Sequence, residues 1–119
     1  MRNFRNLDIW KDSIILVKEV YLFLNDFPHT ETYGLVSQMS RAAISIPSNI
    51  AEGSARNTEK DFKRFLEIAM GSAFELETQI LISIELGVGN KLKANSLLKN
   101  IDVIQKRINS LITKLKANS

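Results

Sequence analysis

The spacing of the apolar residues is the feature that most constrains how this 119-residue chain can fold. In the last segment the apolar residues are separated by steps of 4, 3, 4, 3 and 4 residues. An α-helix turns once every ~3.6 residues, so side chains at these steps share one face. The pattern predicts a helix whose buried face is formed by Leu97, Ile101, Ile104, Ile108, Leu111 and Leu115.

The first segment carries two apolar rows side by side. The first row alternates steps of three and four and comprises Leu7, Trp10, Ile14, Val17, Tyr21 and Leu24. The second row comprises Leu16, Val20, Phe23 and Phe27. So wide an apolar face predicts a helix that packs against more than one neighbouring helix, either inside its own bundle or in another subunit. We expect the helix to end near Asp26, because the residue before Pro28 is pushed away from helical angles.

Two further helices are predicted between these segments. The second should run from about Thr30 to Gly53, where a glycine suits the position just after a helix end. It contains Pro47, which should bend the helix rather than end it. The third should begin at Thr58, whose side chain can cap the helix while Asp61 sits three residues on, and should continue to the glycine-rich turn before the fourth helix.

The segments together predict an all-α, antiparallel up-and-down four-helix bundle that forms a single domain over residues 1–119. Strand patterns with turn chemistry around them are absent from the sequence. Folding the second and third helices back on each other places Ala42 and Ala43 opposite the segment 69–73, where small side chains let two backbones approach closely. Charged residues interrupt every apolar stretch, so we expect no membrane span, and the lack of cysteine fits a cytoplasmic protein.

The segment around Pro47 is polar for a helix that should be buried. Pro47 has no backbone N–H and therefore frees the carbonyl oxygen of Ala43. An unpaired buried carbonyl costs roughly 1–3 kcal/mol, so we expect polar groups nearby to bind it. The candidates are Ser45, Ser48, Asn49 and the indole N–H of Trp10.

Two carboxylates complete this set of structural polar residues. Glu52 lies at the negative end of the helix dipole and should have Arg56 or Arg64 beside it. Glu75 should pair with Arg41. The polar residues to which we assign a structural role are therefore Trp10, Arg41, Ser45, Asn49, Glu52 and Glu75.

The sequence offers little for catalysis or for cofactor binding. His29 is the only histidine and follows a proline in an expected turn, where a solvated loop residue is the simpler interpretation. A di-iron bundle needs paired Glu-x-x-His motifs, and none occurs. Without cysteine, a glycine-rich phosphate loop or a histidine facing a serine, we expect no enzyme, no metal and no organic cofactor.

Charge is the one clue to a binding function. Residues 89–119 carry a net charge of +6, whereas the rest of the chain carries −3. Four cations predict a basic stripe about 20 Å long on the side of the fourth helix away from its apolar face: Lys99, Lys106, Arg107 and Lys114. The helix lacks aromatic residues, so the prediction is RNA or DNA binding without sequence preference. Two alternatives stay open, a merely solvated face and a protein-interaction scaffold that binds no nucleic acid.

Three segments carry a resemblance to a known family: FRNLDIW (residues 4–10), FPHTETYGLVSQMSRAAISIPSNIAEG (27–53) and FKRFLEIAMGSAFELETQ (62–79). They resemble the four-helix-bundle proteins encoded within intervening sequences of bacterial 23S ribosomal RNA genes, a family that includes the accessory variability protein of diversity-generating retroelements. The resemblance covers about residues 4 to 86, and the fourth helix matches only in character. The most specific positions are Gln38, Arg41, Ser45, Asn49, Glu52, Gly53, Gly71, Ser72 and Glu75.

The resemblance implies a bundle that assembles into a ring-like homopentamer with no known enzymatic activity. For the retroelement relatives it also implies binding to nucleic acid and to a reverse transcriptase.

Overall fold

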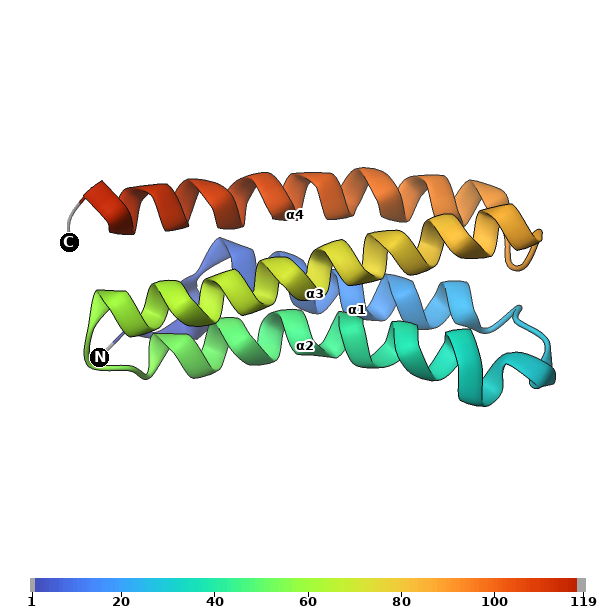
Figure 1. The fold of residues 1–119 in the computed structure, drawn as a ribbon, viewed down its shortest axis with the longest axis horizontal. Coiled ribbons are helices and arrows are strands. Elements are labelled where there is room, and N and C mark those ends of the chain that lie inside the picture. Colours follow the sequence, from blue (N-terminus) through green and yellow to red (C-terminus); the bar gives the residue numbers. More distant parts are fainter. Residues whose placement is uncertain (1, 118–119) are drawn as a thin grey trace.

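The computed structural model describes residues 2–117, which form four long helices packed side by side in an antiparallel bundle (Figure 1). The helices are α1 (Asp8–Leu24), α2 (Ser37–Ser54), α3 (Glu59–Leu86) and α4 (Lys91–Ala117). Short helical turns flank them at Phe4–Asn6, His29–Glu31 and Thr32–Val36. The bundle measures 46 × 21 × 19 Å, and the described residues contain no strand. The predicted up-and-down four-helix fold is therefore confirmed.

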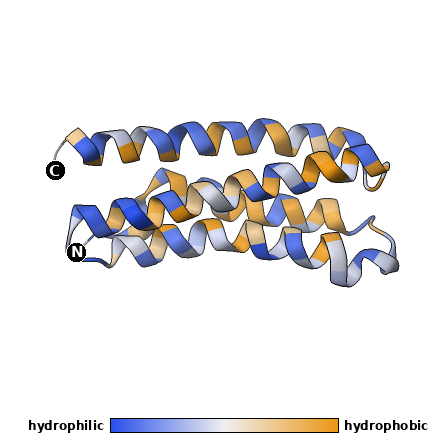
Figure 2. Cartoon of the chain, in the orientation of Figure 1, coloured by the Kyte–Doolittle hydropathy of each residue, from blue (hydrophilic) through white to orange (hydrophobic). Residues whose placement is uncertain are grey.

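The core runs along the middle of the bundle and takes residues from all four helices. On α4 the predicted heptad face is buried, with Ile112 more deeply buried than Leu111. Figure 2 shows hydrophobic and hydrophilic residues alternating along α4, as expected for a helix with one buried and one solvated side.

The two apolar rows of α1 differ in burial. Leu16, Val20 and Phe23 of the second row are at most 1% exposed and lie in the core. In the first row Ile14 and Tyr21 are 43% and 47% exposed. The second row therefore faces the bundle, and part of the first row remains on the surface.

The second helix begins later than the sequence predicts. A 3₁₀ turn and a π turn occupy residues 29–36, where Gly34 has φ −99° and ψ −111°, outside the helical region. Regular α2 then runs from Ser37 past Pro47 to Ser54, so the proline does not end the helix, as predicted.

Gly53 lies inside the last turn of α2, so its assignment to the position after the helix was wrong. A Cβ atom at Gly53 would lie 2.6 Å from Cβ of Phe65 on α3. The glycine is there because the two helices meet closely at this level. Farther along, Ala42, Ala43, Ala69 and Ala73 are all buried, as the predicted contact of small residues requires.

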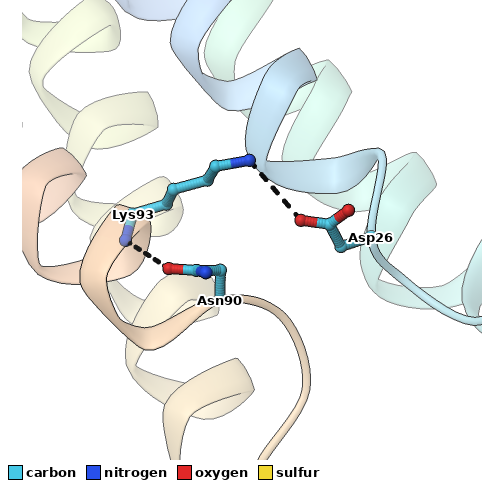
Figure 3. A network of polar contacts seen from close by, with 3 residues as sticks. All are labelled: Asp26, Asn90 and Lys93. Atoms are coloured by element: carbon cyan, nitrogen blue, oxygen red, sulfur yellow. Dashed lines mark hydrogen bonds and ion pairs between the residues drawn. The ribbon is translucent and has the colours of Figure 1, made fainter.

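The turn between α3 and α4 depends on two glycines with positive φ, Gly87 at 70° and Gly89 at 86°. A Cβ at Gly89 would lie 2.6 Å from the ring of Phe27. Asn90 follows and accepts a hydrogen bond of 2.9 Å from the backbone N–H of Lys93, which caps α4. Figure 3 shows this cap together with the ion pair of 3.5 Å between Lys93 and Asp26. The ion pair attaches the start of α4 to the segment that follows α1.

Among the described residues, none of the helices has the length and hydropathy needed to cross a membrane.

Candidate nucleic-acid interface

The four cations of the predicted stripe lie on the solvent side of α4, where Lys99, Lys106, Arg107 and Lys114 are all exposed. Their positions follow from the heptad pattern, because the core residues occupy the opposite side of the same helix. The structure therefore places all four on one helix and outside the core.

Two of these cations already have acidic partners. Lys106 Nζ lies 2.9 Å from Asp102 Oδ2, one turn earlier on α4. Arg107 forms an ion pair with Asp12 of α1. Within residues 2–117, Lys99 and Lys114 have no such partner. The charge available to an external anion is thus smaller than the sequence alone indicates.

A hollow between the start of α1 and the last half of α4 gathers three of the cations. Its lining comprises Leu7, Asp8, Ile9, Lys106, Arg107, Ser110, Leu111 and Lys114. Lys99 lies outside this lining, about 10 Å farther along the helix at ~1.5 Å per residue. We call this feature the α4 hollow. Its lining combines apolar side chains with three cations and the single carboxylate of Asp8.

Hydrogen bonds between amides and carboxylates join α4 to its neighbours beside this face. Asn100 Nδ2 donates to Glu19 Oε2 at 2.9 Å, and Gln105 Nε2 donates to Glu77 Oε1 at 2.7 Å. The sequence reasoning missed both pairs. A useful signal would have been that Asn100 and Gln105 flank the apolar positions of α4, next to the neighbouring helices.

The polar residues near Pro47 form a small network between α2 and α3. Asn49 Nδ2 donates to the carbonyl oxygen of Ser45 at 2.8 Å and to Ser45 Oγ at 2.9 Å. Ser45 Oγ and Ser72 Oγ lie 2.8 Å apart in a hydrogen bond. The carbonyl that Asn49 binds is therefore that of Ser45 and not that of Ala43, which corrects the sequence prediction. Ser72 is a partner that the prediction lacked.

Trp10 is half-buried against the core and makes an edge contact with Phe4, with 5.1 Å between ring centroids. Its carbonyl oxygen accepts a hydrogen bond from Ser13 Oγ at 2.8 Å. The role of Trp10 in the structure is packing at the start of α1.

The two carboxylates assigned to arginine partners behave differently from the prediction. Within the described chain, neither Glu52 nor Glu75 forms an ion pair. Arg56 and Arg64, the expected partners of Glu52, both lie against the ring of Phe65. Aromatic contact thus takes the place of the expected ion pair.

Glu75 and Arg41 do border the same shallow groove between α2 and α3. Glu75 Oε1 accepts from Gln79 Nε2 at 3.4 Å, a long contact. Gln79 is 6% exposed, and its Oε1 is buried without a hydrogen-bond partner among the described residues. The sequence reasoning did not single out Gln79.

His29 is exposed in the turn between α1 and α2. Within residues 2–117 the His, Asp and Glu side chains form no group of three or more that could hold a metal ion.

The fold and this surface define the class of the protein, an up-and-down four-helix bundle with one basic, solvated helix face. Comparison with protein families gives the particular family: the model described as 23S rRNA-intervening sequence protein matches residues 5–110. The chain belongs to this family. The resemblance noted in the sequence is thereby confirmed.

The chain is also similar in structure to a protein of unknown function from the S23 ribosomal protein family of Bacteroides thetaiotaomicron VPI-5482. The two share 23% sequence identity with a TM-score of 0.78, over 87% of this chain and 97% of the other. At this identity the likeness establishes the four-helix fold. A comparison with curated protein sequences gave no match.

Proposed function

We propose that the protein is a non-enzymatic homo-oligomer of four-helix bundles that binds the backbone of RNA or DNA through the basic face of α4. The observation that carries this proposal is the separation of charge, +6 over residues 89–119 against −3 over the rest. Lys99 and Lys114 are exposed on this face and are not neutralised by a carboxylate of the described chain. Phosphate contacts of this kind depend on charge and carry no sequence information.

Sequence-independent binding fits the composition of the helix. α4 contains no aromatic residue on which a base could stack. The cations that line the α4 hollow present ammonium and guanidinium groups, which bind phosphate oxygens of any nucleotide. A protein partner such as a reverse transcriptase and a cytoplasmic location are part of the same proposal.

Assembly into an oligomer is supported by apolar side chains on the surface of the single chain. Ile15, Tyr21 and Leu22 of α1 are 57%, 47% and 49% exposed, and Phe74 of α3 is 54% exposed. Contact with other copies would remove this surface from water. A ring would also repeat the basic face and raise a weak affinity through avidity. The number of five subunits comes from the family resemblance.

A salt titration with a fluorescent single-stranded RNA tests the proposal. The variant Lys99→Gln/Lys114→Gln removes the two cations that lack an acidic partner and leaves Asp12 and Asp102 paired. Loss of two phosphate contacts should reduce the slope of log affinity against log salt by about 1.4. The control variant Lys11→Gln/Lys18→Gln removes the same charge from α1, outside the α4 hollow, and should bind as the wild type does.

Absence of wild-type binding at ~50 mM salt would contradict the proposal. An equal loss in the two variants would show that net charge acts without a defined site.

A protein-interaction scaffold without nucleic-acid binding is the second candidate. It is favoured by the ion pairs of Lys106 with Asp102 and of Arg107 with Asp12, which give two of the four cations a role inside the molecule. In that case neither variant changes RNA binding, because the wild type shows none.

A further inference from the structure

Three arginines gather at the end of the bundle where α2 turns into α3. Cζ of Arg2 lies 4.4 Å from the ring centroid of Phe62. Cζ of Arg56 and Cζ of Arg64 each lie 4.7 Å from the ring centroid of Phe65. Both rings are nearly buried, with 2% and 6% exposed. The guanidinium groups therefore cover the aromatic end of the core, and we call the three residues the arginine cluster.

Most hydrogen-bond donors of the arginine cluster remain available to a ligand. A guanidinium carries five N–H donors, and contact with an aromatic ring leaves donors available for other hydrogen bonds. Arg2 Nη1 donates to the carbonyl oxygen of Arg56 at 3.0 Å and so ties the N-terminal segment to the turn. Within residues 2–117, none of the three arginines forms an ion pair with a carboxylate.

A solvent-open hollow lies beside the cluster. Its lining comprises Arg2, Ala55, Arg56 and Asn57. Arg2, Arg56 and the exposed Asn57 thus border one hollow, and Arg64 lies outside its lining. Guanidinium groups that pair with no carboxylate of the described residues suit a phosphate, which can accept two parallel N–H bonds from a guanidinium.

The arginine cluster is connected to the α4 hollow through the N-terminal segment. Leu7, Asp8 and Ile9 line the α4 hollow beside Lys106 and Lys114. The six steps from Arg2 to Asp8 span at most about 22 Å even when fully extended. A flexible polyanion that contacts α4 is therefore within a few nucleotides of the arginines.

We propose that Arg2, Arg56 and Arg64 form a second phosphate-binding site for the same nucleic-acid strand that contacts α4. This inference rests on the proposed function and extends it, because it takes the strand around the end of the bundle and not only along one helix. A repeating polyanion is favoured over an acidic protein surface because the cations border two separate hollows, which one extended strand can reach in turn.

The test compares Arg56→Gln/Arg64→Gln with Arg56→Lys/Arg64→Lys in the full chain, using a 20-nucleotide oligouridylate as the probe. The glutamine variant should bind at least ~10-fold more weakly near physiological salt and lower the salt slope by about 1.4. The lysine variant keeps the charge and should retain most of the slope, with lower affinity from the lost bidentate geometry. Both variants lose the guanidinium contact with Phe65, so equal midpoints of thermal unfolding separate binding from folding.

Three outcomes would overturn the inference. If Lys99→Gln/Lys114→Gln weakens binding and Arg56→Gln/Arg64→Gln does not, the strand stays on α4 and the proposed function stands alone. If the wild type binds no RNA at low salt, the proposed function fails and this site fails with it. If oligoglutamate binds as tightly as RNA and is lost in the arginine variant, the cluster recognises acidic protein.

Discussion

At some positions the packing of two helices leaves room for glycine alone. Gly53 and Gly71 both lie in helices, yet their surroundings differ completely. The Cβ position at Gly53 falls 2.6 Å from Cβ of Phe65, whereas the Cβ position at Gly71 has nothing within 4 Å. One glycine is required by helix contact and the other is not.

We expect Gly53→Ala to destabilise the protein by about 1–3 kcal/mol, because a Cβ–Cβ clash can be relieved only by moving α2 away from α3. The matched change Gly71→Ala should raise stability by about 0.5–1 kcal/mol, since alanine favours an exposed helix position. Urea unfolding followed by circular dichroism measures both. Equal effects of the two changes would contradict the close approach at Gly53.

The sequence shows which polar residues are structural, but not which residue each of them contacts. The sequence identified Ser45 and Asn49 as buried polar partners, and they do form a network. It could not tell that Arg56 and Arg64 contact Phe65 and not Glu52, because both arrangements satisfy an arginine and the choice depends on side-chain geometry. Gln79 escaped notice because glutamine is usually solvated, although its position three residues after Leu76 places it on the buried face of α3.

The spacing of apolar residues located all four helices. The residues at which the helices begin and end were harder to predict. The start of α2 was placed too early because Leu35 and Met39 continue the helical spacing of apolar residues, while Gly34 departs from helical dihedral angles. On α1 both apolar rows fit a core. Which row is buried depends on where α2 and α4 pack, and that is a property of the assembled bundle.

The first turn of α4 allows a cap and an ion pair to be compared directly. Asn90→Ala removes the cap on Lys93 N and should destabilise the protein by about 1 kcal/mol. Lys93→Gln removes an ion pair whose side chains are 50% and 56% exposed, so it should cost about 0.5 kcal/mol or less. Thermal unfolding at two salt concentrations checks this, and only the Lys93 variant should lose its difference at high salt. A larger loss in Lys93→Gln would contradict the assignment of Asn90 as the cap.

For the whole molecule, the exposed apolar residues of α1 predict an oligomer in solution. Light scattering at micromolar concentration should give a mass several times that of one chain, with five as the expected number. Leu22→Gln should shift the distribution toward smaller species, because Leu22 is 49% exposed and its loss leaves the core intact. Lys60→Gln introduces the same residue on an exposed, polar part of α3 and should leave the mass unchanged. A monomeric wild type would contradict the oligomer, whereas a dimer would contradict only the number.

The up-and-down path of the helices also has a consequence for the order in which the chain folds. Each helix packs on its neighbour in sequence, and proteins with mostly local contacts fold within about microseconds to milliseconds. The contact between α1 and α4 is the exception, since it joins Asp12 to Arg107 and Glu19 to Asn100 across 95 and 81 residues. Closing so long a loop is delayed by its entropy, so we expect this seam to form last and to open first. A nucleic-acid strand bound at the α4 hollow would contact both α1 and α4. It would therefore slow unfolding of the bundle.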